Sequence, residues 1–147
     1  MYLGTIGNMS TARAMLDLHV FDDALLVARG KLDAAVITSL GLEAARVAGP
    51  GLLEGARRAA ADRDAQRFAL LAAMPRDQLL AAHRSNRLIP IESIQSALLT
   101  TRWWRGSRLE LVVDGQKVRF GWKVVYNEPA FCEQVLRAAL GDRLTVR

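Results

Sequence analysis

Apolar and polar residues alternate near the start of the chain, and this alternation predicts a β-hairpin. Around Asp17 and His19, which occupy polar positions, every second side chain is apolar, as in a half-buried strand. Two aspartates then predict a turn, and the apolar run ALLVAR after them predicts the partner strand. We therefore expect a first hairpin over residues 13–29, with His19 on its polar side.

A period of 3.6 residues replaces this alternation between residues 31 and 86 and predicts a helical segment. Its apolar stripe, which must pack against some surface, consists of Val36, Ile37, Leu40, Ala44 and Val47. Gly49-Pro50-Gly51 interrupts the segment, Pro75 predicts a restart, and Asn86 predicts a helix end. The sequence thus predicts a long helical insertion after the first hairpin.

Residues 88–126 return to strand-like patterns. A short extended piece with a turn at Pro90–Ser93 leads into three runs, residues 94–104, 108–113 and 116–124. Together with the first hairpin they predict an antiparallel sheet of about five strands, which is few for closing a barrel.

A final helix is predicted over residues 127–141. Asn127 occupies the position of an N-cap, Pro129 suits the first turn, and Gly141 ends the helix. The expected buried face consists of Phe131, Val135, Leu136 and Leu140.

The Asp-Gly pair at 114–115 predicts a tight hairpin and fixes its register. Asp-Gly favours a type I′ turn, because both central residues of that turn need positive φ. The turn pairs Leu109 with Phe120 on one face and Glu110 with Arg119 on the other, a favourable cross-strand pair of opposite charges.

The preceding turn decides where the two tryptophans of TTRWWRGSR point. A two-residue turn at Gly106-Ser107 would bury Arg102, which is costly. A three-residue turn over residues 105–107 keeps Arg102 on the outer face, places Trp103 in the core and turns Trp104 outward. Because a slip by one residue flips every side chain, we expect the three-residue turn.

With this register, one face of the predicted sheet is basic and aromatic. The candidate binding residues on it are Arg102, Trp104, Arg105, Arg108, Lys117 and Arg119. Such side chains can stack on bases and contact phosphates, and they also favour a lipid headgroup layer. A protein partner, a solvated face, or cover by the helical segment or a second subunit would equally account for this face. The sequence leaves these interpretations open.

The charge distribution adds weight to this region. The formal net charge of +5 lies entirely in residues 84–147, which hold eleven Lys/Arg and six Asp/Glu. A basic half invites an anionic partner, although a net charge of this size is also common on small soluble domains.

Chemistry-bearing motifs are absent from the sequence, so we expect no enzyme, no metal site and no cofactor. His19 and His83 are far apart, and the run GTIGN lacks the strand–helix context of a phosphate loop. The single Cys132 excludes an internal disulfide and is expected to pack on its helix. No signal peptide or stretch long enough to span a membrane is evident, which predicts a cytoplasmic protein without a transmembrane segment.

Three runs, IPIESIQSALLTT, RLELVVDGQKVRFGW and NEPAFCEQVLRAAL, resemble the second half of bacterial pleckstrin-homology-like (PH-like) domains. In that family a short entry leads into three antiparallel strands and a helix that plugs the barrel. The helix corresponds here to Glu128–Leu140, and the entry to Ile89, Pro90, Ile91 and Ile94. The resemblance covers residues 13–29 and 88–140. It implies an α+β fold with a PH-like antiparallel sheet or partial barrel and a C-terminal helix.

Two departures from the family bear on function. The insertion at 31–86 stands where further strands are usual, and the turn at 21–24 is acidic where lipid-binding members of the wider superfamily carry basic residues. A chain of 147 residues fits a single domain, 1–147. The resemblance implies that it acts as a non-enzymatic interaction or scaffolding module for a protein partner or for itself. The alternative is a binder of an anionic ligand, nucleic acid or an acidic membrane surface, through the basic outer face.

An open sheet and an apolar helix stripe both need cover. They predict a homodimer in which the helical segment, residues 31–86, contributes to the interface. An intramolecular lid formed by the same helices is the alternative.

Overall fold

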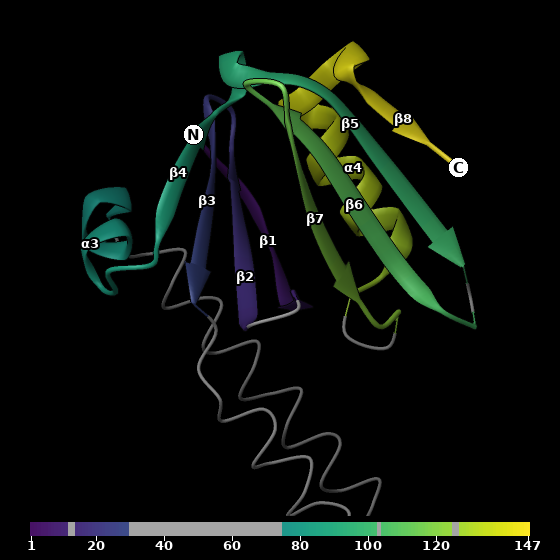
Figure 1. The fold of residues 1–147 in the computed structure, drawn as a ribbon, viewed down its shortest axis with the longest axis horizontal. Coiled ribbons are helices and arrows are strands. Elements are labelled where there is room, and N and C mark those ends of the chain that lie inside the picture. Colours follow the sequence, from purple (N-terminus) through teal and green to yellow (C-terminus); the bar gives the residue numbers. More distant parts are fainter. Residues whose placement is uncertain (12–13, 30–74, 103, 125–126) are drawn as a thin grey trace, which may run out of the picture. The chain divides into compact units, whose positions relative to one another are not determined.

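A computed structural model describes residues 1–11, 14–29, 75–102, 104–124 and 127–147 of the chain. They form an α+β structure with one mostly antiparallel eight-stranded sheet and a C-terminal helix, which confirms the expected fold class at this level (Figure 1). The strands are β1 (Tyr2–Ser10), β2 (Met15–Phe21), β3 (Ala24–Arg29), β4 (Arg87–Pro90), β5 (Ile94–Arg102), β6 (Gly106–Val113), β7 (Gln116–Trp122) and β8 (Leu144–Val146). The helices are α3 (Arg76–Ala81) and α4 (Pro129–Leu140), with short 3-10 turns η1 (Ile91–Ser93) and η2 (Gly141–Arg143).

The sheet consists of two halves, each built from strands that are close in sequence. The strand order is β4-β3-β2-β1-β7-β6-β5-β8, and only the β5–β8 pairing is parallel. β1 and β7 join the halves through one registered pair, Ser10 with Gly121. The expectation of about five strands was too low, because β1 and β8 carry no clear alternation and were not predicted.

The first hairpin is confirmed, but the side of it that was expected to face solvent is buried. Val20 pairs with Leu25, which places the turn at the two aspartates. His19 was expected on a polar surface and is instead fully buried, as is Asp17. The cause is β1, whose Thr5 lies directly opposite His19 and whose Oγ1 is 2.7 Å from His19 Nδ1.

A bulge in β1 accounts for the buried hydrogen bond of Asp17. The register shifts between Ile6 and Met9, so the backbone of Gly7 and Asn8 leaves the ladder, and Asn8 adopts a φ of 54°. The amide N of Asn8 donates to Asp17 Oδ1 at 3.0 Å. Buried backbone groups that lose a ladder partner need such replacements.

The hairpin at the Asp-Gly turn is confirmed in full. Leu109 pairs with Phe120 and Glu110 with Arg119, and Asp114 has a φ of 49°. Leu109, Leu111 and Phe120 are buried. Turn chemistry and apolar pattern agree here, and agreement between the two makes a register predictable.

The predicted position of the preceding turn, between β5 and β6, was wrong. Arg102 pairs with Gly106 and Leu99 with Leu109, so the turn falls over residues 103–105 and not 105–107. Gly106 belongs to the strand, where its φ is 88° and a Cβ would lie 2.3 Å from the carbonyl oxygen of Trp122. In the expected register Leu99 paired with Val113, four residues beyond its observed partner Leu109. Because four is an even number, the side chains of both strands stay on their expected faces of the sheet. Trp104 is exposed as expected, and the predicted burial of Trp103 lies outside the described residues.

The last helix, α4, packs against β1, β2, β5 and β8. Val135, Leu136 and Leu140 are buried as predicted, and Gly141 ends the helix with a φ of 55°. Phe131 was expected in the core but is 39% exposed, whereas its neighbour Cys132 is buried.

Asn127 does not cap this helix, because the residue at the cap is Glu128 and no side chain bonds there. Asn127 is buried and bonds both backbone groups of Gly7 in the β1 bulge: its Oδ1 accepts from Gly7 N at 3.1 Å, and its Nδ2 donates to Gly7 O at 2.7 Å. The side chain thereby fastens the start of α4 to β1.

Most of the predicted helical insertion lies outside the described residues. Met1–Gly30 and Arg76–Arg147 form one compact unit, and the second unit, Lys31–Pro75, is described only at Pro75. The apolar stripe, the homodimer and the single-domain boundary therefore stay predictions. α3 follows Pro75 as expected, and it ends at Ala81 rather than at Asn86. No helix among the described residues is long and apolar enough to cross a membrane.

Candidate functional site

The six candidate binding residues are all exposed. Arg102 ends β5, Arg108 lies on β6, and Lys117 and Arg119 lie on β7, with their side chains on the face opposite the core. Trp104 and Arg105 occupy the β5–β6 turn at one end of this face.

Glu110 divides the six residues into two groups. Its carboxylate lies 2.7 Å from Arg119 Nε and 3.4 Å from Lys117 Nζ, so one acid serves two cations. The hydrogen bond from Arg119 holds the pKa of Glu110 below its ordinary value. Lys117 and Arg119 are thus partly neutralised by a neighbour on the same face.

The other group, Arg102, Trp104, Arg105 and Arg108, is named here the basic turn surface. Among the described residues no carboxylate forms an ion pair with any of its three arginines. Trp104 is 62% exposed. The pairing of Arg102 with Gly106 and the bond from Arg105 N to Arg102 O at 3.0 Å close the turn that carries these side chains.

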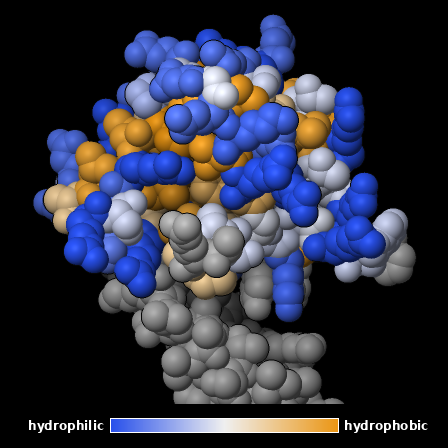
Figure 2. Space-filling view, in the orientation of Figure 1, coloured by the Kyte–Doolittle hydropathy of each residue, from blue (hydrophilic) through white to orange (hydrophobic). Residues whose placement is uncertain are grey.

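Large exposed apolar side chains are few in the described part of the chain: Met1, Trp104 and Phe131. Hydrophobic residues gather toward the middle of the face in Figure 2, and hydrophilic residues frame them. Of these three side chains, only Trp104 belongs to the candidate binding residues.

No protein-family model matches this chain, and no curated protein does.

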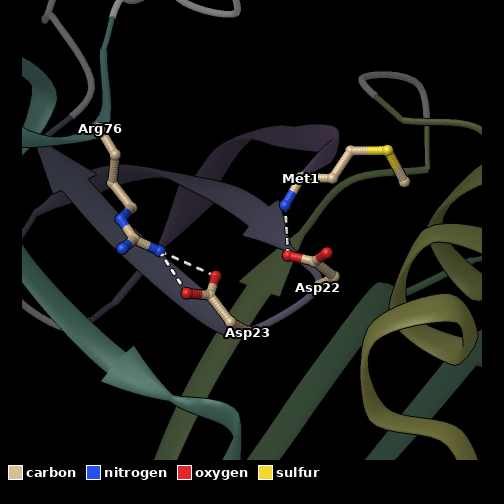
Figure 3. Close-up of polar contacts among 4 residues, drawn as sticks. All are labelled: Met1, Asp22, Asp23 and Arg76. Atoms are coloured by element: carbon tan, nitrogen blue, oxygen red, sulfur yellow. Dashed lines mark hydrogen bonds and ion pairs between the residues drawn. The ribbon is translucent and has the colours of Figure 1, made fainter.

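The acidic turn of the first hairpin is occupied by cations from its own chain. The amino group of Met1 pairs with Asp22, and Arg76 Nη1 contacts both carboxylate oxygens of Asp23 at 2.7 and 2.8 Å (Figure 3). The bond from Arg76 keeps the pKa of Asp23 below its ordinary value. No local sequence pattern predicts this contact, because Arg76 lies 53 residues away from Asp23 in the chain.

Aromatic contacts complete this corner. The guanidinium of Arg76 lies 5.7 Å from the centre of the Phe21 ring, and Tyr2 meets Phe21 edge to face. A cation stacked and ion-paired in this way is held by the fold. We assign this corner a structural role, that of fixing the start of α3 to the β2–β3 turn.

Cys132 and His19 are buried. Burial raises the pKa of Cys132 to about 11, which leaves the thiol protonated at neutral pH. The hydroxyls of Tyr2 and Thr5 lie 2.6 Å apart and continue the chain to His19. Among the described residues no group of His, Cys, Asp and Glu has the arrangement of a metal site.

Proposed function

We propose that this chain is a non-enzymatic interaction module that binds an anionic partner through the basic turn surface. The observation that carries the proposal is the set of three exposed arginines that form no ion pair with a carboxylate among the described residues, beside exposed Trp104. Ion-paired surface arginines, by contrast, have part of their charge satisfied within the fold, as Arg119 has.

The chemistry of these side chains supports binding. A guanidinium offers a planar fork of donors that matches phosphate and carboxylate, and it is weakly hydrated. Tryptophan and arginine are the residue types most often found to dominate binding energy at interfaces. Trp104 and Arg105 lie in the β5–β6 turn, and Arg102 and Arg108 lie on the two strands that this turn joins.

We further propose that the module is PH-like. Four antiparallel neighbours, β1 to β4, are followed by the β5–β6–β7 meander and then by α4, an order that supports the resemblance. The cation-filled turn at Asp22 and Asp23 supports a binding surface elsewhere than at the first hairpin.

Salt dependence tests the proposal. If all three arginines contact phosphates of a single strand, affinity should fall about 20-fold between 50 and 200 mM salt, because each neutralised phosphate releases counterions. Vesicles with acidic lipids, a single-stranded oligonucleotide and polyglutamate serve as the three probes.

Charge reversal at Arg102, Arg105 and Arg108 together should abolish binding. The matched control reverses three arginines elsewhere, Arg84, Arg87 and Arg137, so that the net charge of the two variants is the same. Equal loss in both would mean that only the overall charge matters. No binding by the unaltered protein at 50 mM salt would contradict the proposal.

A protein partner is the second candidate, and the exposure of Trp104 favours it because an apolar anchor gives affinity that salt does not screen. Binding of a protein that persists at high salt and is lost with Trp104→Ala would support this candidate over the first.

A further inference from the structure

Gly121 leaves a gap in the row of side chains on the outer face of β7. Its neighbours Phe120 and Trp122 point into the core, so position 121 faces outward. A Cβ placed on Gly121 would meet only the carbonyl oxygen of Ser107, at 3.8 Å. The surface above this backbone is therefore open, and a glycine within a strand often marks a place where another group approaches closely.

Cationic residues surround this gap, which is named here the Gly121 notch. Arg108 lies directly across on β6, Arg119 lies two residues earlier on β7, and Lys123 lies two residues later. All three are exposed. Cross-strand neighbours stand about 5 Å apart, so Arg108 can reach a group seated over Gly121. Arg119 stands about 7 Å away along β7 with its Nε bonded to Glu110, and Lys123 follows directly after the end of β7.

The fourth side of the notch is held by β1. Ser10 pairs with Gly121 across the seam between the two halves, and its hydroxyl donates to Gly121 O at 3.2 Å. That bond occupies the carbonyl oxygen, so it is less available to repel an anion. Glu110, which pairs with Arg119 across the two strands, is engaged by Arg119 and Lys117.

We propose that the Gly121 notch takes a backbone phosphate of a single-stranded nucleic acid whose neighbouring base stacks on Trp104. This rests on the proposed function and names its ligand. Arg108 belongs to both the notch and the basic turn surface. From it, the β6 backbone runs two residues to Gly106 and into the turn, a distance of roughly 10 Å. The two surfaces therefore form one line of cations that ends at an exposed aromatic ring.

A single strand fits this line better than the other anionic partners do. Its phosphates repeat along a chain, and its unpaired bases can stack on an aromatic side chain. A bilayer surface could contact the turn, but it would place no group in the open space above Gly121 on the sheet. A carboxylate polymer offers charge without a planar group for Trp104.

The test fills the notch without changing any charge. Gly121→Val adds a β-branched side chain that suits a strand, at a position where the nearest atom to a Cβ is 3.8 Å away. Thr145→Val on β8 is the control, because it places the same valine side chain at an exposed site on the same sheet, three strands from β7. Gly121→Ala, with less bulk, serves as a second variant, and thermal melting checks that each variant is folded.

Binding is measured by fluorescence anisotropy with a labelled single-stranded 12-mer at 50 mM salt. We expect Gly121→Val and Trp104→Ala each to weaken binding about tenfold or more, Gly121→Ala to weaken it less, and Thr145→Val to leave it unchanged. All four variants should melt within a few degrees of the unaltered protein.

The outcomes separate this inference from the function on which it rests. Unaltered binding by folded Gly121→Val would overturn the notch while leaving the basic turn surface intact. Binding to acidic vesicles or polyglutamate but not to the oligonucleotide would overturn the nucleic-acid assignment. Failure to bind all three probes would remove both.

Discussion

Asn127 offers the sharpest test of how the two halves of the fold are held together. Replacement by alanine removes both partners of Gly7, whose N–H and C=O are buried in the β1 bulge. A buried polar group left without a partner costs about 1–3 kcal/mol. We therefore expect Asn127→Ala to lower the free energy of unfolding by about 2–4 kcal/mol, and the melting temperature by roughly 8–16 °C.

Urea unfolding followed by circular dichroism measures this loss. Gln134→Ala on the exposed face of α4 is the control and should stay within about 0.5 kcal/mol of the unaltered protein. A loss from Asn127→Ala no larger than that of the control would refute the account of the bulge.

Asn127→Asp adds a pH dependence with a definite sign. The new carboxyl can still accept from Gly7 N, but when ionised it faces Gly7 O with no proton to donate. Burial should raise its folded pKa above the unfolded value of about 3.9. The variant is then destabilised at neutral pH, and its deficit relative to the unaltered protein should shrink as pH falls from 7 toward 4.

Three further outcomes are expected. Cys132, with a pKa raised to about 11 by burial, should resist a thiol reagent at pH 8 until urea unfolds the protein; stoichiometric labelling of the native state would contradict its placement. Glu110 has a folded pKa below its ordinary value, so its contribution to stability is present at neutral pH and is lost as pH falls through that lowered pKa; Glu110→Gln should remove this part of the acid sensitivity, and an unchanged pH profile would count against the pairing with Arg119. The helical segment, residues 31–86, should support a homodimer visible by light scattering at micromolar concentration, and a constant monomer mass across that range would reject it.

The sequence predicts this fold best where turn chemistry and apolar period act together. The Asp-Gly turn is encoded by adjacent residues, and the pairs Leu109–Phe120 and Glu110–Arg119 follow from it. The β5–β6 turn was misplaced because Gly106 reads as a turn residue. Its absent Cβ is required inside the strand by the carbonyl of Trp122, a neighbour across the sheet.

β1 could not be predicted from local signals. Its glycines and the bulge at Gly7 and Asn8 interrupt alternation, and the partner that repairs the bulge, Asn127, lies 120 residues away. The burial of His19 follows from β1 and was missed for the same reason. Cys132 was expected to pack on its helix and is buried, and it lies four residues before Leu136 and eight before Leu140, on the face of α4 that packs on the sheet.

The candidate site was predicted in composition but not in organisation. Exposure of Arg102 follows from a register with the correct parity, whereas Trp104 is exposed in the turn after β5. The sharing of Glu110 by Lys117 and Arg119 depends on side-chain conformations, which the strand register alone does not determine. Gly121 carried a usable signal, since a glycine within a strand marks close approach, but that signal gains meaning only when the residues around it are known.

The junction between β1 and β7 has a consequence for how the protein folds while it is being synthesised. The apolar side of β2, with Leu18 and Val20, is covered in the finished fold partly by α4, whose Leu136 emerges from the ribosome more than a hundred residues later. At bacterial-to-eukaryotic synthesis rates this delay is roughly 6–23 s. The first hairpin must therefore wait, with one side unprotected, far longer than a hairpin takes to form. Contacts between distant parts of a chain are slow to form, so the step that joins N-terminal β1 to β7 and α4 sets the period during which the nascent chain is open to chaperones and to aggregation.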